Sequence, residues 1–281
     1  MTKYKALAIA TDFWRPSTDY LAEIAGGIRE AIEDGDIVAI SEKAIATALG
    51  RIVNENEVEP SRSAKLIANY WMRIIWGYIL GPICRFRNGL LSYLRGYPIG
   101  MGSHHKQVVL QQAGLLQALM FGSEGGIDGS NLAYAYVGLP LSDANRIAEE
   151  ICREVESRLA KKVLVMIVDT DKTYSFHNFH FTPRPKPIKG IHSFGGVITY
   201  LAGRLFKFRK RPTPVAVAGG RIRVEESLKA ANIANHMRGA GSGKTVWDMA
   251  KKFDVGLDEV SWEMLETVKH KPIVIVRKSG G

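Results

Sequence analysis

Two short segments carry carboxylates beside glycine or hydroxyl residues, and together they could hold a metal ion and a phosphate group. In residues 124–131 (EGGIDGSN), Asp128 lies among glycines and small polar side chains. Asp169 and Thr170 follow an apolar run. Carboxylate and hydroxyl oxygens suit Mg²⁺ or Mn²⁺, and glycine lets a backbone approach its ligand closely. Taken alone, however, residues 124–131 also have the composition of an ordinary surface turn.

Predicted strands precede several of these polar residues, and this position favours a ligand site over a simple turn. Three apolar runs predict buried strands: residues 5–10, 37–40 and 163–168. Glu42 and Lys43 come shortly after the second run, and Asp169 comes directly after the third. Open α/β sheets place ligand groups at the carboxyl ends of their strands. We therefore expect these side chains to lie along one edge of a sheet.

Helical patterns separate the predicted strands, so the sequence indicates a mixed α/β fold. Residues 142–159 form the clearest helix, because apolar residues recur there every four positions. Residues 19–32 and 223–235 have similar helical spacing. Residues 97–105 (YPIGMGSHH) are rich in glycine and predict a mobile loop. The length of 281 residues fits one large domain or two modest ones.

A tryptophan-rich segment at residues 70–84 imitates a membrane span. It is interrupted by Arg73, two glycines and a proline, and it is shorter than the roughly 20 residues that cross a bilayer. We predict a buried helix or a subunit interface, with no membrane span. Contact with a membrane surface is the alternative, because three arginines follow closely: Arg85, Arg87 and Arg95.

The overall charge favours polyanionic partners. A net charge of +10 and a pI of about 9.5 suit nucleotides, phosphorylated cofactors, nucleic acid or anionic lipid. The only cysteines, Cys84 and Cys152, have no paired spacing, so neither a disulfide framework nor a zinc knuckle is indicated. The first ten residues lack the apolar core of a secretion signal, so we expect a cytoplasmic protein.

Residues 239–245 (GAGSGKT) end like a P-loop but do not have its spacing. A P-loop has four residues between its first glycine and the Gly-Lys pair, and here there are three. A P-loop also follows a strand, whereas the pattern before Gly239 is helical. The sequence therefore excludes a P-loop NTPase. A glycine-rich turn whose amides and Lys244 approach phosphate oxygens remains in agreement with the sequence.

Residues 182–214 look like a basic, proline-containing excursion or subdomain. Residues 182–189 (TPRPKPIK) are typical of a rigid loop or a domain boundary. Residues 204–211 (RLFKFRKR) alternate phenylalanine with cations. This pattern suits nucleic-acid backbones, but it also suits a half-buried strand with a solvated basic face. We favour the strand.

Three segments, in this order and spacing, resemble the coenzyme F420 gamma-glutamyl ligases. They are residues 34–51 (DGDIVAISEKAIATALGR), 126–131 and 168–170. Members of that family join L-glutamate to a deazaflavin phosphodiester cofactor and consume GTP. The resemblance implies a mixed α/β fold, with mixed sheets flanked by helices, in an intertwined homodimer. The family's core would then correspond to residues 1–181 and 215–281.

The resemblance also implies which residues bind ligands. Divalent metal, Mg²⁺ or Mn²⁺, would lie on Asp128, Asp169 and Thr170. Contacts to the nucleotide, GTP in the family, would come from six positions: Glu42, Lys43, Asn131, Gly239, Gly241 and Gly243. The sequence itself does not distinguish GTP from ATP.

Three departures from the family's pattern leave the acceptor substrate open. After the Asp-Thr pair the family continues with glycine and a series of arginines, where this chain has residues 171–177 (DKTYSFH). An acidic metal ligand of the family's later glycine turn falls at Ala240, and a nucleotide-binding lysine falls at Thr47. One ligand, one cation and the arginine cluster are therefore missing from the expected site.

The expected chemistry is amide formation through an acyl phosphate. Metal ions on the terminal phosphates would offset the charge that develops during phosphoryl transfer, and no side-chain nucleophile is needed. The expected partners are GTP, L-glutamate and a phosphorylated small-molecule acceptor. A non-catalytic relative that binds a nucleotide or a phosphorylated cofactor is the alternative. An RNA-binding protein, suggested by charge and residues 204–211, ranks below both.

Overall fold

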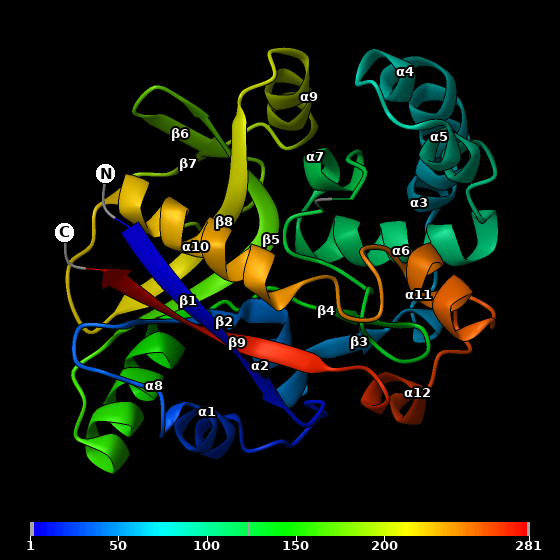
Figure 1. Cartoon of the computed structure of the whole chain (residues 1–281). Helices are drawn as coiled ribbons and strands as arrows, with labels where there is room; N and C mark the ends of the chain where they lie inside the picture. Colours follow the sequence, from blue (N-terminus) through cyan, green and yellow to red (C-terminus); the bar gives the residue numbers. More distant parts are fainter. Residues whose placement is uncertain (1–2, 123, 280–281) are drawn as a thin grey trace.

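A seven-stranded mixed sheet forms the centre of the computed structural model, which describes residues 3–122 and 124–279 (Figure 1). The strand order is β1-β9-β2-β5-β6-β7, and β8 pairs with β5 along the edge opposite to β2. β2 runs parallel to β5 and β6 parallel to β7, and the other pairs are antiparallel. The bounds are β1 Lys3–Thr11, β2 Ile37–Ser41, β5 Leu164–Phe176, β6 Phe179–Thr182, β7 His192–Ser193, β8 Arg209–Ala218 and β9 His270–Ser279. The predicted mixed α/β fold is confirmed.

Helices cover both faces of this sheet. β2 shows why, because alternate residues of a strand point to opposite faces and all four of its apolar residues are buried. Val38 and Ile40 pack in the core formed with α1 (Tyr20–Ile28), α2 (Glu42–Ala48) and α8 (Ala144–Leu159). Ile37 and Ala39 pack on the other side, against α10 (Val224–Arg238).

A second, largely helical part contains its own apolar core. Its elements are β3 (Ile52–Asn54), η1 (Glu55–Glu57), α3 (Arg62–Leu66), η2 (Ile67–Leu80), α4 (Gly81–Ile83), α5 (Asn88–Arg95), α6 (Ile99–Gln112), α7 (Leu115–Ala118), β4 (Tyr136–Gly138) and α9 (Val197–Leu205). Trp76 is fully buried, stacks on Phe86 at 5.7 Å between ring centroids, and donates its indole N–H to the Leu119 carbonyl at 2.8 Å. β3 and β4 form a separate two-stranded sheet.

The tryptophan-rich segment is helical as predicted, but it is buried on one side only. η2 is a π-helix, with Met72 and Trp76 in the core and Tyr70, Ile74 and Tyr78 exposed. Across residues 3–122 and 124–279, no helix combines the length and apolar character that crossing a bilayer would require.

Two local predictions are wrong. The glycine-rich residues 97–105 are not a loop, because residues 99–105 form the first half of α6, where Gly102 leaves room for the Tyr97 ring. Residues 204–211 are not a single strand, because α9 ends at Leu205 and β8 begins at Arg209. Packing against side chains from distant elements determines the secondary structure of both segments. A local sequence pattern carries no information about that packing.

The C-terminal elements close over the carboxyl ends of β2 and β5. α10 leads through residues 239–245 into α11 (Val246–Phe253), followed by α12 (Trp262–Glu266) and β9. Figure 1 shows α11 and α12 beside β3 and β4, on the side of the sheet that carries α6. Residues of α6, β4, α10 and α11 line a large cavity.

Candidate functional site

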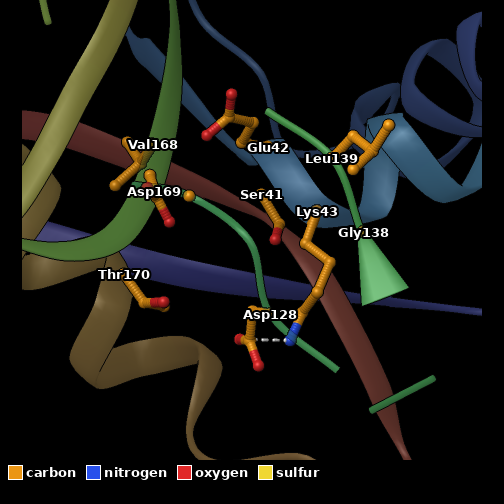
Figure 2. A pocket seen from close by; sticks show the side chains of 10 residues that line it. Ser41, Glu42, Lys43, Asp128, Gly138, Leu139, Val168, Asp169 and Thr170 are labelled. Carbon is orange, nitrogen blue, oxygen red and sulfur yellow. Dashed lines mark hydrogen bonds and ion pairs between the residues drawn. The ribbon is translucent and has the colours of Figure 1, made fainter. Parts of the chain in front are cut away.

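A cavity of about 740 Å³ lies between the strand ends, α6 and the α10–α11 connection. It is continuous in its lining with a small pocket, of about 20 Å³, at the carboxyl ends of β2 and β5. The small pocket is drawn in Figure 2 and is lined by Ser41, Glu42, Lys43, Gly126, Asp128, Gly138, Leu139, Val168, Asp169 and Thr170. The three predicted metal ligands and two of the six predicted nucleotide contacts therefore lie together.

Parallel pairing of β2 with β5 explains this convergence. Ser41 is the register partner of Val168, so the residues that follow each strand emerge at one edge of the sheet. Glu42 and Lys43 begin α2 there, and Asp169 and Thr170 continue β5. A bridge from Asp128 to Gly138 brings the glycine-rich segment to the same edge.

Lys43 and Asp128 form the central ion pair of the small pocket. The Lys43 ammonium donates to Asp128 Oδ2 at 2.7 Å (Figure 2), and it also donates to Ser130 Oγ at 2.9 Å. The Ser130 amide donates to Asp128 Oδ1 at 2.8 Å. Burial raises the pKa of Asp128, but Lys43 and the bonds from Ser130 outweigh it, so the pKa lies below its usual value. Asp128 is therefore an anion, as a metal or phosphate site requires.

Arg184 joins the other two carboxylates of the pocket. Its guanidinium forms ion pairs with both Glu42 and Asp169 and is 2% exposed. Burial raises the pKa of Glu42 to about 7, although Arg184 opposes this effect. The Leu141 amide donates to Glu42 Oε1 at 2.8 Å. Glu42, predicted to contact nucleotide, thus supports Arg184 from inside the protein.

Asp171 adds a third carboxylate beside Asp128 and Asp169. It is buried and accepts a hydrogen bond from the Gly126 amide at 2.9 Å. Burial raises its pKa well above the usual value, and the nearby charges of Asp169 and Asp128 raise it further. Sequence reasoning missed both Asp171 and Arg184. Asp171 is two positions after Asp169, and this spacing was the available signal, because it places side chains on one side of a regular strand. In β5 the register shifts between Asp169 and Lys172. Nothing in the spacing marked Arg184.

The donor set fits a metal ion that is shared with a phosphate group. No described residues form a cluster of three or more His, Cys, Asp or Glu that could hold a metal alone. Mg²⁺, however, is commonly held by one or two carboxylates together with substrate phosphates and water. Asp128, Asp169 and the exposed hydroxyl of Thr170 provide such a partial set. Lys43 and Arg184 already balance part of the carboxylate charge, so an ion would have to share these oxygens with them.

Asn131 fastens the glycine-rich α10–α11 connection over the site. Its Oδ1 accepts hydrogen bonds from the amide and hydroxyl of Ser242, both at 2.6 Å, and its Nδ2 donates to the Gly243 carbonyl at 3.0 Å. Gly241 has φ of +61°, and a Cβ there would lie 2.4 Å from Asn131 Oδ1. Gly239, Gly241 and Gly243 all line the large cavity. The predicted nucleotide-binding turn therefore faces the cavity, with the Asn131 amide holding it in place.

The two substituted positions also face the cavity. Ala240 is exposed at its rim. Thr47 is buried, and its hydroxyl donates to the Lys43 carbonyl at 2.8 Å within α2. The structure thus offers no carboxylate at the first position and no cation at the second.

Besides Lys43, six Lys and Arg residues line the large cavity, and none of these six forms an ion pair with a carboxylate in the described parts of the chain. They are Lys172, Lys210, Arg238, Lys244, Lys269 and Lys271. Burial lowers the pKa of Arg238 to about 10, although Asp169 opposes this effect, and burial also lowers the pKa of Lys172. An anionic ligand would relieve the cost of holding these charges together.

A buried charged cluster forms another wall of the cavity. His105 contacts Glu55 Oε1 through Nδ1 at 2.5 Å and Glu124 Oε2 through Nε2 at 2.6 Å. Lys106, which is fully buried, donates to Glu124 Oε1 at 2.7 Å and to the Met120 carbonyl at 2.9 Å. This cluster fixes the start of residues 124–131 against α6, and so positions Asp128.

Comparison with known proteins identifies the family of the chain. Residues 8–277 match the family F420-0:Gamma-glutamyl ligase. The chain is 30% identical to an uncharacterized protein of Methanocaldococcus jannaschii, over 97% of this chain and 96% of the other. It is also 30% identical to the Coenzyme F420:L-glutamate ligase of Archaeoglobus fulgidus, over 54% of each chain. A match to nearly the whole length establishes that the chain belongs to the F420-0:Gamma-glutamyl ligase family.

Proposed function

We propose that this protein is a nucleotide- and divalent-metal-dependent ligase that forms an amide between L-glutamate, or a similar amino acid, and a phosphorylated small-molecule acceptor. Its membership of the ligase family supports the reaction class. The single observation that carries the nucleotide assignment is the large cavity, which has carboxylates at one end and six unpaired cations around it. GTP is the co-substrate we propose, by analogy with the family.

The proposed reaction has two balanced steps. A substrate carboxylate attacks the terminal phosphorus of GTP, so that a carboxylate oxygen–phosphorus bond forms and GDP leaves. The amine of the second substrate then attacks the acyl carbon, an amide forms, inorganic phosphate leaves, and the amine loses a proton. The chain's residues bind and orient these groups, and no side-chain nucleophile takes part.

The cations and glycine turn of the cavity fit the phosphate groups. Lys172, Arg238 and Lys244 are positioned around the opening between β5 and the α10–α11 connection. The amides of that glycine-rich turn provide further donors for phosphate oxygens. When bound, a divalent ion on Asp128 and Asp169 would supply neutralisation of the terminal phosphate charge. A volume of about 740 Å³ is within the range of small-molecule sites.

A non-catalytic relative is the second candidate, and one observation favours it. Ala240 leaves a methyl group where the family has an acidic metal ligand, while Lys43 and Arg184 already balance Asp128 and Asp169. Such a protein would hold a nucleotide or phosphorylated cofactor without turning it over. Both candidates share the same ligand chemistry, so turnover separates them.

Release of inorganic phosphate from GTP tests the proposal. We expect the purified protein with Mn²⁺ to release phosphate when L-glutamate and a deazaflavin phosphodiester acceptor are both present. Asp169→Asn should abolish this release, and Glu156→Gln, an exposed carboxylate on the distant helix α8, should leave it unchanged. Nucleotide binding without release, for every acceptor tried, would establish the non-catalytic candidate instead.

A further inference from the structure

The positive charge of the chain is concentrated in two stretches that contain no acidic residue. Residues 60–122 and 172–224 hold 18 of the 38 Lys and Arg residues and none of the 28 Asp and Glu residues. The remaining 20 cations are outnumbered by acids, so the rest of the chain is net negative. The protein is therefore strongly polarised, with its excess charge on the helical part and on the β5–β8 region.

The same two stretches expose a set of large apolar side chains. On η2 and α4, Tyr70, Ile74, Tyr78, Ile79 and Ile83 are exposed. On α9 and just after it, Ile198, Leu205 and Phe206 are exposed, Phe206 to 71%. At the turn between β5 and β6, Phe176 and Phe179 are about half exposed. We call these ten residues the apolar end.

The parts of the apolar end lie at one end of the molecule (Figure 1) and are connected through side chains packed beneath and between them. The Trp76 ring meets Tyr200 of α9 at 5.7 Å, and the Arg204 guanidinium lies 4.8 Å over the Phe86 ring, so α9 packs beside η2 and α4. Phe208 meets both Phe206 and Phe176, at 5.7 and 5.6 Å, which links α9 to the β5–β6 turn. Figure 1 shows α4, α9 and β6 at one end of the molecule, with α1 and α12 at the other.

Cations without carboxylate partners accompany the apolar end. Arg73, Arg85, Arg87, Arg95, Arg204 and Lys207 lie on η2, on α5 and α9, or directly beside these helices. None of these six forms an ion pair within residues 3–122 and 124–279. Arg95 instead lies 4.6 Å over the Tyr78 ring. Basic and aromatic residues around exposed aliphatic side chains are the composition of an element that lies in a membrane interface.

We propose that the apolar end binds the surface of an anionic lipid bilayer without crossing it. Charge complementarity selects this occupant, because the two stretches carry an excess of cations and no acidic residue of their own, and such segments are attracted to anionic headgroups. A second copy of the chain packed through this same surface would bring like charges together, so we place any homodimer contact on another face. RNA would gain stacking from aromatic rings, but exposed isoleucines such as Ile74, Ile79, Ile83 and Ile198 offer it nothing. The same isoleucines gain free energy when they enter the boundary of the acyl chains.

Co-sedimentation of the full chain with lipid vesicles tests this inference. We expect binding to vesicles of phosphatidylcholine mixed with phosphatidylglycerol, little binding to phosphatidylcholine alone, and loss of binding as salt increases. The exposed pair Ile74→Ser/Phe206→Ser should weaken partitioning by about tenfold. Arg85→Glu/Arg87→Glu should weaken it by at least about tenfold.

Matched controls come from exposed residues elsewhere. Leu7→Ser/Leu49→Ser and Arg153→Glu/Lys162→Glu change the same chemistry away from the apolar end and should leave partitioning unchanged. Equal binding to both kinds of vesicle, or none, would overturn the inference. So would tighter binding to a single-stranded RNA oligonucleotide than to vesicles, or a dimer in sedimentation velocity that Ile74→Ser/Phe206→Ser dissociates.

Discussion

The Lys43 ammonium lies 2.7 Å from Asp128 Oδ2, although the two residues are 85 positions apart in the chain. Lys43 sits in the first turn of a helix and Asp128 in a glycine-rich segment. Their pairing holds that segment against the carboxyl end of β2 and keeps Asp128 ionised. This ion pair makes Lys43 a positioning residue for the proposed metal site. It also makes Lys43 a competitor of the metal ion for the Asp128 carboxylate.

Lys43→Met tests this double role. Without the ammonium, the pKa of Asp128 should rise, because burial is then opposed only by the Ser130 bonds. We expect stability to fall by about 1–3 kcal/mol, the usual loss for a buried or half-buried charge-assisted hydrogen bond. Urea unfolding measures the stability, and the pH dependence of Mn²⁺ binding measures the pKa. Unchanged stability and an unchanged pH profile would contradict the role of Lys43.

Arg184→Met should destabilise the fold more strongly than any other single change in the pocket. It leaves Glu42 and Asp169 without their shared cation in a buried environment, and breaking a buried ion pair typically costs about 3–5 kcal/mol. Arg184→Lys should recover only part of this, because an ammonium does not reproduce the planar fork. Thermal unfolding provides the comparison, with the largely exposed Arg209→Met as control. Equal midpoints for the Arg184→Met and Arg209→Met variants would contradict the account.

The His105 cluster predicts a stability that falls at alkaline pH. Burial lowers the pKa of His105, but Glu55 and Glu124 outweigh it and raise the pKa to about 10. A group whose pKa is higher in the folded than in the unfolded state stabilises the fold fully at low pH. The contribution of His105 is therefore lost as pH rises from about 6.5 through about 10. The free energy of unfolding of the wild type should therefore approach that of His105→Gln over this range. A constant difference between the two proteins would show that His105 is neutral in the fold.

Glu124 should behave in the opposite sense. Burial raises its pKa, but Lys106 and His105 outweigh it and lower the pKa to about 2. The stabilisation is then present above about pH 4.5 and is lost as pH falls towards 2. Glu124→Gln should remove the part of the acid-induced loss of stability that comes from Glu124, so the variant's stability should change less than that of the wild type over this interval. Circular dichroism across a pH series measures it, and an identical acid transition in both proteins would contradict the assignment.

Ala240→Asp asks whether the missing carboxylate limits metal binding. Ala240 is exposed at the cavity rim, so an aspartate fits without repacking. We expect Mn²⁺ affinity to rise by about tenfold, because another hard oxygen ligand joins Asp128 and Asp169. Ala240→Asn supplies a similar shape without the charge and should give a smaller gain. No change in either variant would place the metal away from the α10–α11 connection.

The sequence was sufficient to predict at which edge of the sheet the site lies. Strands β2 and β5 are short apolar runs, and polar residues after parallel neighbouring strands must emerge together. Glu42, Lys43, Asp169 and Thr170 were found in this way. Asp128 was found from the glycines and small polar residues around it, and the family resemblance grouped it with Asp169 and Thr170.

What the sequence did not contain was the long-range pairing within the site. Arg184 contacts Glu42 across 142 positions, and no local pattern signals such a contact. The loop prediction in the helical part was wrong for a related reason. The glycines of α6 suggested a loop, whereas Gly102 is there because the Tyr97 ring occupies the space of its side chain. Tertiary packing overrode local propensity in this helix.

Calorimetric titration of the protein with a non-hydrolysable GTP analogue, with and without Mn²⁺, tests the central claim most directly. If the cavity is a metal–nucleotide site, Mn²⁺ should strengthen nucleotide binding, and Asp128→Asn should weaken metal and nucleotide binding together by about tenfold or more. Its loss of stability should not exceed the loss of about 1–3 kcal/mol expected for Lys43→Met, since asparagine keeps an oxygen for the Ser130 amide. Absence of nucleotide binding in wild type, or a large loss of stability in Asp128→Asn with unchanged Mn²⁺ affinity, would contradict the account.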